Sequence, residues 1–380
     1  MKKALLATAL TVALVNTAHA NIRINGFANF IGGMASDDRV VSPTQDPLYG
    51  YDDRISFREE SLFALQASGD VNDRMSATVQ VLARGENDFD VDFEWAYLTY
   101  RVTNNMAVSA GRFRLPLFKL SDSLDVGYSH HWISAPQAVY EVPFNDLDGF
   151  RIDYSDFAGD WEYKLGAAIG TFENEISAGT IEGDNTFMVS AELSNEWLSI
   201  RSVYGSTKAT FDQPDLNQQI NGQLSDVAPG LRDYLLMEDD TGRFIGIGVQ
   251  IDTFDWFIGG EYTNIDIEES YTPEDEAWYV TAGLRVGKWT PSVTYQSFEG
   301  DEVKGVEQLA KLGEPLQTAI TPSLLAISSV FAQNYTVASA TVRYDYDANI
   351  ALKAEISRYS DDLDDARDAT LGRIAINYVF

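Results

Sequence analysis

The sequence predicts an all-β protein: a 16-stranded antiparallel transmembrane β-barrel with short turns at one end and long loops at the other. Three observations lead to this prediction. Apolar and polar residues alternate along many segments, and the connections between these segments are alternately short and long. After residue 20, no stretch is apolar over the roughly 18 residues that a membrane helix needs, so helical spans are excluded.

The first twenty residues have the features of a secretory signal peptide. A basic head (Met1, Lys2, Lys3) precedes an apolar run, and Ala18-His19-Ala20 forms an A-x-A cleavage pattern. We therefore expect cleavage before Asn21 and one barrel domain over residues 21–380. The sequence contains no cysteine, so we expect stability to come from a large closed fold without disulfide bonds.

The strands are predicted from residues that alternate between an apolar and a polar face. In MSATVQVLAR (75–84) the odd positions are apolar and nearly all of the even positions are polar or small, which is typical of a strand wet on one side. Sixteen such segments occur, and the fourth and fifth are ambiguous in phase. They lie near 22–34, 57–68, 75–84, 93–101, 106–115, 149–156, 161–170, 186–193, 197–206, 243–252, 256–263, 277–286, 290–298, 334–344, 350–358 and 371–380.

The connections separate into two classes that follow one another strictly along the chain. Turns of a few residues alternate with long loops near 35–56, 85–92, 116–148, 171–185, 207–242, 264–276, 299–333 and 359–370. An up-and-down barrel across a membrane has this arrangement. Four tryptophans (161, 197, 256 and 289) directly follow short turns, where interfacial indole rings are favoured.

The charge is strongly negative and lies mainly in the long loops. The net charge is −31, and runs such as DDLDDARD (361–368) account for much of it, so nucleic-acid binding is excluded. Two interpretations stay open. The loops form a solvated, repulsive rim, or their carboxylates share divalent cations with the phosphates of lipopolysaccharide. We expect no cofactor.

The polar face of the strands predicts a water-filled interior. Nine cations lie on it: Arg23, Arg84, Arg151, Lys164, Arg201, Arg285, Arg343, Lys353 and Arg373. Five carboxylates share that face: Asp153, Glu162, Glu192, Glu261 and Glu355. Burying so many charges in a solid core is unfavourable, whereas sixteen strands leave a lumen that water fills.

Residues 96–116, AYLTYRVTNNMAVSAGRFRLP, resemble the strand, turn, strand and Gly-Arg motif of Gram-negative outer-membrane porins. The resemblance is to general diffusion porins of marine gammaproteobacteria and to the phosphate-porin-like group. It implies a homotrimer in the outer membrane, with the third loop (117–148) folded into the pore. It also implies that Arg112 is a pore-wall arginine, and Arg114 shares its phase. Asp122, Asp125, Glu141 and Asp146 would then face the arginines across a constriction.

The sequence departs from the porin pattern in two places. The second strand starts Ser61-Leu62-Phe63-Ala64, without the usual wall arginine, although Arg58 lies just upstream. The segment Leu309 to Phe331 combines a helical stretch with the apolar run LLAISSVF. Either it plugs the mouth of the barrel or it packs against a neighbouring subunit.

The last strand, GRIAINYVF, explains why the chain ends on an aromatic residue. An open sheet edge is not tolerated in hydrocarbon, so we expect this strand to pair with the first one and close the barrel. Resemblance adds that Tyr378 and Phe380 form the signal that the outer-membrane barrel assembly machinery reads.

These features together predict a porin for passive diffusion of small hydrophilic solutes and ions, with weak ion selectivity. One alternative is a channel specific for phosphate or other anions, guided by a ladder of arginines. Another is an oligosaccharide channel, with Tyr128, Trp132 and Tyr140 as stacking platforms. Enzymatic activity is not expected, because the mature chain has only His130 and His131 as histidines, and adjacent residues on an extended segment point apart.

Overall fold

The chain forms one closed β-barrel in a computed structural model. The structure describes residues 22–36, 49–140, 142, 144–176, 179–226, 228–301, 304, 310–311, 313–314, 317–318, 321–322, 325 and 331–380. The predicted signal peptide therefore lies outside the described residues. So does most of segment 309–331, although Phe331 packs against Phe211 and Tyr271 with ring centroids 5.8 and 5.6 Å apart.

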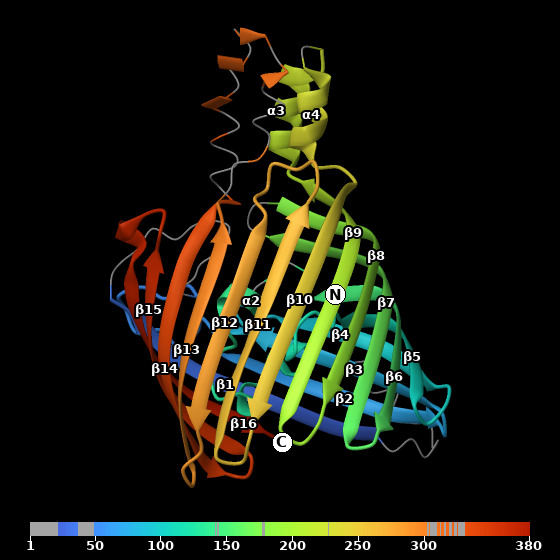
Figure 1. Cartoon of the computed structure of the whole chain (residues 1–380), viewed down its shortest axis with the longest axis vertical. Coiled ribbons are helices and arrows are strands. Elements are labelled where there is room, and N and C mark those ends of the chain that lie inside the picture. The colour runs from blue at the N-terminus through green and yellow to red at the C-terminus, as the bar shows by residue number, and fades with distance from the viewer. Residues whose placement is uncertain are drawn as a thin grey trace.

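Sixteen antiparallel strands follow each other around the barrel, as predicted (Figure 1). The strands are β1 (Ile22–Ala35), β2 (Leu62–Asn72), β3 (Met75–Arg84), β4 (Val91–Arg101), β5 (Met106–Arg114), β6 (Asp146–Ala158), β7 (Trp161–Ile176), β8 (Gly179–Ser194), β9 (Leu198–Asp212), β10 (Asp240–Asp252), β11 (Trp256–Ile267), β12 (Asp275–Leu284), β13 (Trp289–Gly300), β14 (Gln333–Asp347), β15 (Ile350–Asp361) and β16 (Ala369–Val379). Three α-helices are described in the loops: α2 (Gln137–Tyr140), α3 (Pro214–Leu224) and α4 (Pro229–Leu236).

The predicted seam between the two ends of the chain is confirmed. Strand β1 pairs with β16 from Phe27↔Val379 to Ala35↔Leu371. The backbone of Phe380 exchanges two hydrogen bonds of 3.0 Å with Gly26. The Phe380 ring lies over Gly26, where an added Cβ would be 2.3 Å from the ring, and it stacks near Phe63 and Tyr378. Glycine at position 26 thus makes room for the terminal aromatic ring.

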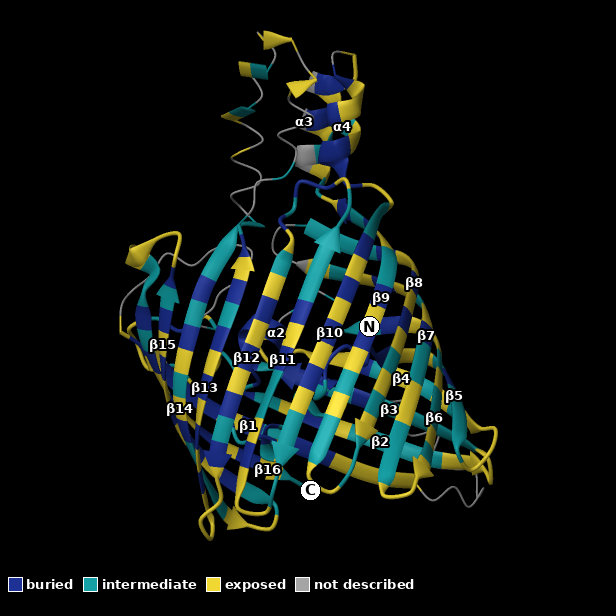
Figure 2. Cartoon of the chain, viewed as in Figure 1, coloured by how far each residue is buried: buried dark blue, intermediate teal, exposed yellow. Residues whose placement is uncertain are grey.

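Alternating exposure along the strands separates an apolar outer face from a more polar inner one (Figure 2). In β16 the side chains of Ile374, Ile376 and Tyr378 are exposed, while those of Arg373 and Asn377 are buried inside the barrel. This is the sidedness that the sequence predicts. Among the described residues, no helix is long and apolar enough to cross a membrane.

The loops differ from the prediction in two respects. The region expected to be a loop at 171–185 is mostly an extension of the β7–β8 hairpin, with register shifts at Gly170/Phe172 and at Asp184/Phe187. The loop at 207–242 contains α3 and α4, each starting with a proline in its first turn, where the missing N–H is tolerated. Figure 1 shows these two helices standing beyond the end of the barrel that carries the long loops.

Candidate functional site: the third loop inside the barrel

The third loop, which we call L3 (residues 115–145), connects β5 to β6 and runs through the interior of the barrel. It contains α2 and two 3₁₀ turns, Ser121–Ser123 and Gly127–Ser129. Several of its apolar side chains are fully buried, among them Leu117, Ile133 and Val139. In Figure 1, α2 lies within the barrel outline. L3 therefore occupies the lumen, as its resemblance to the porin loop implies.

One side of L3 is held by the strands near the seam. Lys353 on β15 donates to the carbonyl of Gly127 at 2.6 Å, and Arg343 on β14 donates to that of His130 at 2.6 Å. The indole N–H of Trp132 donates to Thr294 on β13 at 2.8 Å. Two cations assigned to the water-facing wall thus serve to hold loop backbone.

A second attachment lies at Glu261 on β11. Its carboxylate accepts the backbone N–H of Lys119 at 2.9 Å and the hydroxyl of Tyr279 at 2.8 Å, and it also accepts the hydroxyl of Tyr140. Burial, and then Glu261, raises the pKa of the Tyr140 hydroxyl well above its usual value, so this group stays a proton donor. The start and the end of L3 are thereby fixed to the same carboxylate.

A third attachment is a buried ion cluster around Asp125, which we call the Asp125 cluster (Arg84, Glu94, Arg114 and Asp125). Arg84 Nη2 lies 3.2 Å from Asp125 Oδ1, and Arg114 Nη2 lies 2.6 Å from Asp125 Oδ2. Both guanidinium groups also bind Glu94 on β4. Burial by itself raises the pKa of Asp125, but the two arginines outweigh it and hold the pKa below its usual value.

Glu94 reaches this cluster because β4 carries a bulge. Gln80 pairs with Trp95 and Val81 pairs with Phe93, so Glu94 is the extra residue and points inward. Without the bulge, strict alternation would place Glu94 on the outer face with Leu98. Sequence reasoning missed this residue, because a single inserted position in a phase-ambiguous strand leaves no periodic signal.

Charged side chains also line the inner face of β6 to β9. Arg151 lies 2.8 Å from Asp153 and 3.8 Å from Asp122 of L3. Further along, Lys164 pairs with Glu162 at 3.4 Å and Arg201 with Glu192 at 3.8 Å. The Asp122 side chain is 78% exposed, whereas that of Asp125 is buried. The Arg201 guanidinium also donates to the carbonyl of Pro116, so L3 contacts this wall as well. The lumen space around the exposed Asp122 side chain is the candidate conduction path.

The interpretation of Arg112 as a pore-wall residue is wrong. In the β5–β6 register, Val108 faces Ile152, Ala110 faces Phe150 and Arg112 faces Asp148. Phe150 and Ile152 are exposed on the outer surface of the barrel, so Arg112 continues that outer face and forms an ion pair of 2.6 Å with Asp148. Gly111 has a φ of +128°, a conformation that glycine adopts easily. It also lets β5 approach β4 closely just before L3 begins.

The other predicted site residues lie in different surroundings. Arg23 pairs with Asp70 at 3.5 Å and Arg285 with Asp252 at 2.7 Å, both on the inner face toward the short turns. Asp146 is partly buried at the start of β6, directly opposite Arg114 in the register, and Glu141 lies outside the described residues. The carboxylates predicted to face the arginines across a constriction therefore differ from one another. Asp125 is held in buried ion pairs, whereas Asp122 is exposed to the lumen.

The described part of the first long loop, residues 49–61, which we call loop 1, also enters the barrel, and the sequence did not reveal this. Glu60 accepts from Arg373 at 2.6 Å, and Tyr51 is buried beside it. Arg373 also binds Glu355 on β15 and lies over the ring of Tyr49 at 4.6 Å. The side chains of Arg373 and Glu355 are only 4% and 3% exposed. This three-residue ion group (Glu60, Glu355, Arg373) anchors loop 1 near the seam.

The two histidines after residue 20 are packed in L3. His130 Nε2 lies 2.8 Å from the carbonyl of Ser123, and burial, followed by Lys353, lowers the His130 pKa to about 4. The His131 ring lies 3.8 Å from that of Trp132 and contacts Thr281. Within the described part of the chain, no group of three or more metal-ligating side chains is found.

Known structures with the same fold support this description. A trimeric form of OmpT, an outer membrane protein of Vibrio cholerae, superposes with a TM-score of 0.55 at 14% identity, covering 95% of this chain and 99% of that one. OmpF of Salmonella typhi gives 0.58 at 10% identity (96% and 99%), and an anion-selective porin from Comamonas acidovorans gives 0.57 at 12% (95% and 100%). No family model and no curated protein sequence matches. The chain therefore has the porin fold, a fold of Gram-negative outer-membrane proteins.

Proposed function

We propose that the chain is an outer-membrane porin: a water-filled channel for passive diffusion of small hydrophilic solutes and ions. The observation that supports this most is the exposed Asp122 on L3, which faces the charged wall of β6 to β9 inside a closed barrel. Because L3 occupies the lumen and is bound to strands around much of the barrel, the channel is narrow. Because acids and bases alternate along the wall, ion selectivity is weak.

The two specific-channel alternatives have less support. A phosphate channel needs arginines with free hydrogen-bonding capacity, yet Arg84, Arg114, Arg343 and Arg373 are occupied by carboxylates or loop carbonyls. An oligosaccharide channel needs accessible aromatic rings. Trp132 and Tyr140 are buried, and the partly exposed Tyr128 has the Arg343 guanidinium 4.9 Å from its ring centroid.

Conductance in a planar lipid bilayer tests the proposal. We expect ohmic single-channel currents and a reversal potential that corresponds to weak selectivity in a salt gradient. Added phosphate or a linear maltooligosaccharide should cause no saturable block. A saturable block by either would support the corresponding specific channel, and a preference above roughly tenfold for one ion would overturn weak selectivity, since it exceeds about 1.4 kcal/mol.

We further propose that the protein assembles as a homotrimer in the outer membrane and has no enzymatic activity. The homotrimer is supported by one structure of the same fold, which is a trimer form. The absence of enzymatic activity is supported by the packing of both histidines against loop carbonyls and rings. Lipid and lipopolysaccharide would surround the barrel, with divalent cations shared between its acidic loops and lipid phosphates as one proposed contact.

Phe380 is proposed to act as part of the assembly signal together with Tyr378. Deleting Phe380 removes two backbone hydrogen bonds to Gly26 and the ring that covers it. We expect a marked fall in the amount of assembled, heat-modifiable barrel in outer membranes, with nearly unchanged conductance of the channels that do form. The exposed Phe254, located in a short turn, offers a control residue: its replacement by alanine should leave the yield unchanged. Equal yields for the Phe380 deletion and the wild type would contradict the proposal.

A further inference from the structure

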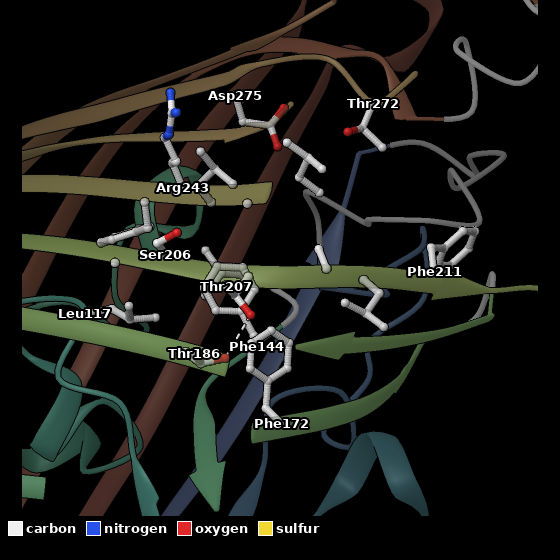
Figure 3. Close-up of a pocket in the computed structure, with 18 of the residues that line it drawn as sticks. Leu117, Phe144, Phe172, Thr186, Ser206, Thr207, Phe211, Arg243, Thr272 and Asp275 are labelled. Carbon is white, nitrogen blue, oxygen red and sulfur yellow. Dashed lines mark hydrogen bonds between the residues drawn. The ribbon is translucent and has the colours of Figure 1, made fainter. Parts of the chain in front are cut away.

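The half of the lumen nearer the long loops contains a cavity whose lining is unlike the charged wall described above. Its volume is about 330 Å³, and it lies between L3 and the inner faces of β7 to β13 (Figure 3). Leu117 and Phe144 of L3 form part of its lining, with Phe172 on β7 and Phe244 on β10. The rings of Phe144 and Phe172 stack with centroids 5.4 Å apart.

The polar groups around this cavity are mostly engaged with protein partners. Thr186 and Thr207 share a hydrogen bond of 2.8 Å, drawn in Figure 3, and Thr272 bonds with Ser270 at 2.8 Å. Arg243 forms its ion pair with Glu268, in line with the outer-facing residues of β10. A hydrophilic solute in this cavity would therefore lose water without gaining equivalent hydrogen bonds, which is unfavourable.

An apolar surface inside a water-filled lumen is not needed to close a barrel. Ligand sites in proteins are typically cavities of roughly 300–1,000 Å³ with apolar and aromatic walls and a few polar groups. The size and lining of this cavity match that description. Among the described residues that line it, Asp275 is the one acid. The acidic loops at the mouth also raise the local concentration of cations.

We propose that this cavity is a binding site for a small organic cation with an apolar body, such as an aromatic or short-chain amine. The apolar body lies among Phe144, Phe172 and Phe244, and the ammonium group faces Asp275. The inference rests on the proposed function, because a solute reaches the cavity along the lumen. The proposed site would retain a class of solute that a purely polar channel would not.

The test uses the full barrel (residues 21–380) in lipid nanodiscs, since detergent would itself enter an apolar cavity. The probe is 2-(aminomethyl)naphthalene, and the comparison solutes are 2-naphthalenemethanol and glucose. Saturable binding is read from the naphthalene fluorescence, and current block by the same solutes is measured in planar bilayers. We expect the amine to bind and block most strongly, the alcohol less strongly and glucose not at all.

Gly205 on β9 provides the variant that fills the cavity. A Cβ there would lie at ordinary contact distances, 3.6 Å from Phe244 Cβ, so we expect Gly205→Leu to fold and to place its side chain in the cavity. We expect it to weaken amine binding at least about tenfold, the usual size of such a change in a hydrophobic pocket. Gly372→Leu is the matched control, because its Cβ would meet nothing within 4 Å on the exposed face of β16. It should bind as the wild type does.

The outcomes separate this inference from the proposed function. Absence of saturable amine binding to the wild type, or unchanged binding to Gly205→Leu, would overturn the site. Asp275→Asn should reduce amine binding toward that of the alcohol, and equal amine affinity in this variant and the wild type would overturn the role of the carboxylate. A wild-type barrel that binds the amine without conducting ions would refute the channel and leave the site standing. Conductance without amine binding would refute the site and leave the channel standing.

Discussion

Replacing Asp125 by alanine is expected to lower the free energy of unfolding by about 3–5 kcal/mol, because the change removes one partner from a buried ion group. Arg84 and Arg114 would keep Glu94, with Glu86 3.9 Å from Arg84, to balance two largely buried positive charges. L3 would also lose its ion pairs to β3 and β5, so single-channel conductance should rise and become noisier. Urea unfolding in lipid vesicles and single-channel recording measure the two effects.

Asp122→Ala is the matched control, since Asp122 is an exposed carboxylate three residues earlier in the same loop. Its effect on stability should stay within about 0.5 kcal/mol. Equal stabilities of the Asp125→Ala and Asp122→Ala variants would contradict the account. The pH dependence has a definite sign. Because the folded pKa of Asp125 is lowered, its contribution is complete above about pH 4, near the unfolded value, and is lost only as the pH falls through the folded value.

The second large effect is expected for Arg373→Met. This change leaves Glu60 and Glu355 buried without their shared guanidinium group, which should again cost about 3–5 kcal/mol of the free energy of unfolding. The control is Arg23→Met, because Arg23 forms an exposed ion pair with Asp70 and such pairs contribute roughly 0–1 kcal/mol.

A rescue experiment separates lost charge balance from lost packing. Glu355→Gln added to Arg373→Met removes one of the two uncompensated charges, so the double variant should regain part of the lost stability. If the double variant is as unstable as Arg373→Met alone, the destabilisation arises from packing against Tyr49 and loop 1 rather than from buried charge. That result would count against the ion group as the anchor of loop 1.

Much of the barrel was predictable because the membrane imposes a strict rule on each strand. Lipid on one side and polar groups on the other enforce alternation, and Ile374, Arg373 and Asn377 lie on the sides that alternation predicts. The seam was equally predictable, since an open edge is forbidden in hydrocarbon. The entry of L3 into the lumen was predicted from the resemblance to porins alone, because a buried loop has no periodic sequence pattern.

The errors occur where alternation is interrupted. The bulge at Glu94 and the positive φ at Gly111 lie in the two strands whose phase was ambiguous, and there Arg112 was placed on the wrong face. The extension of the β7–β8 hairpin was missed because register shifts at Phe172 and Phe187 break the pattern. The apolar cavity was missed because its residues come from L3 and many separate strands.

The central claim is that ions cross the barrel through the lumen space around the exposed Asp122 side chain of L3. The chain has no cysteine, so Asp122→Cys introduces a single thiol at this exposed position. Single-channel current in a planar bilayer is recorded before and after adding a charged methanethiosulfonate reagent. A lasting stepwise change in current is predicted, with opposite shifts in ion selectivity for cationic and anionic reagents. Confirmed labelling of the thiol with no change in current or selectivity would contradict the claim.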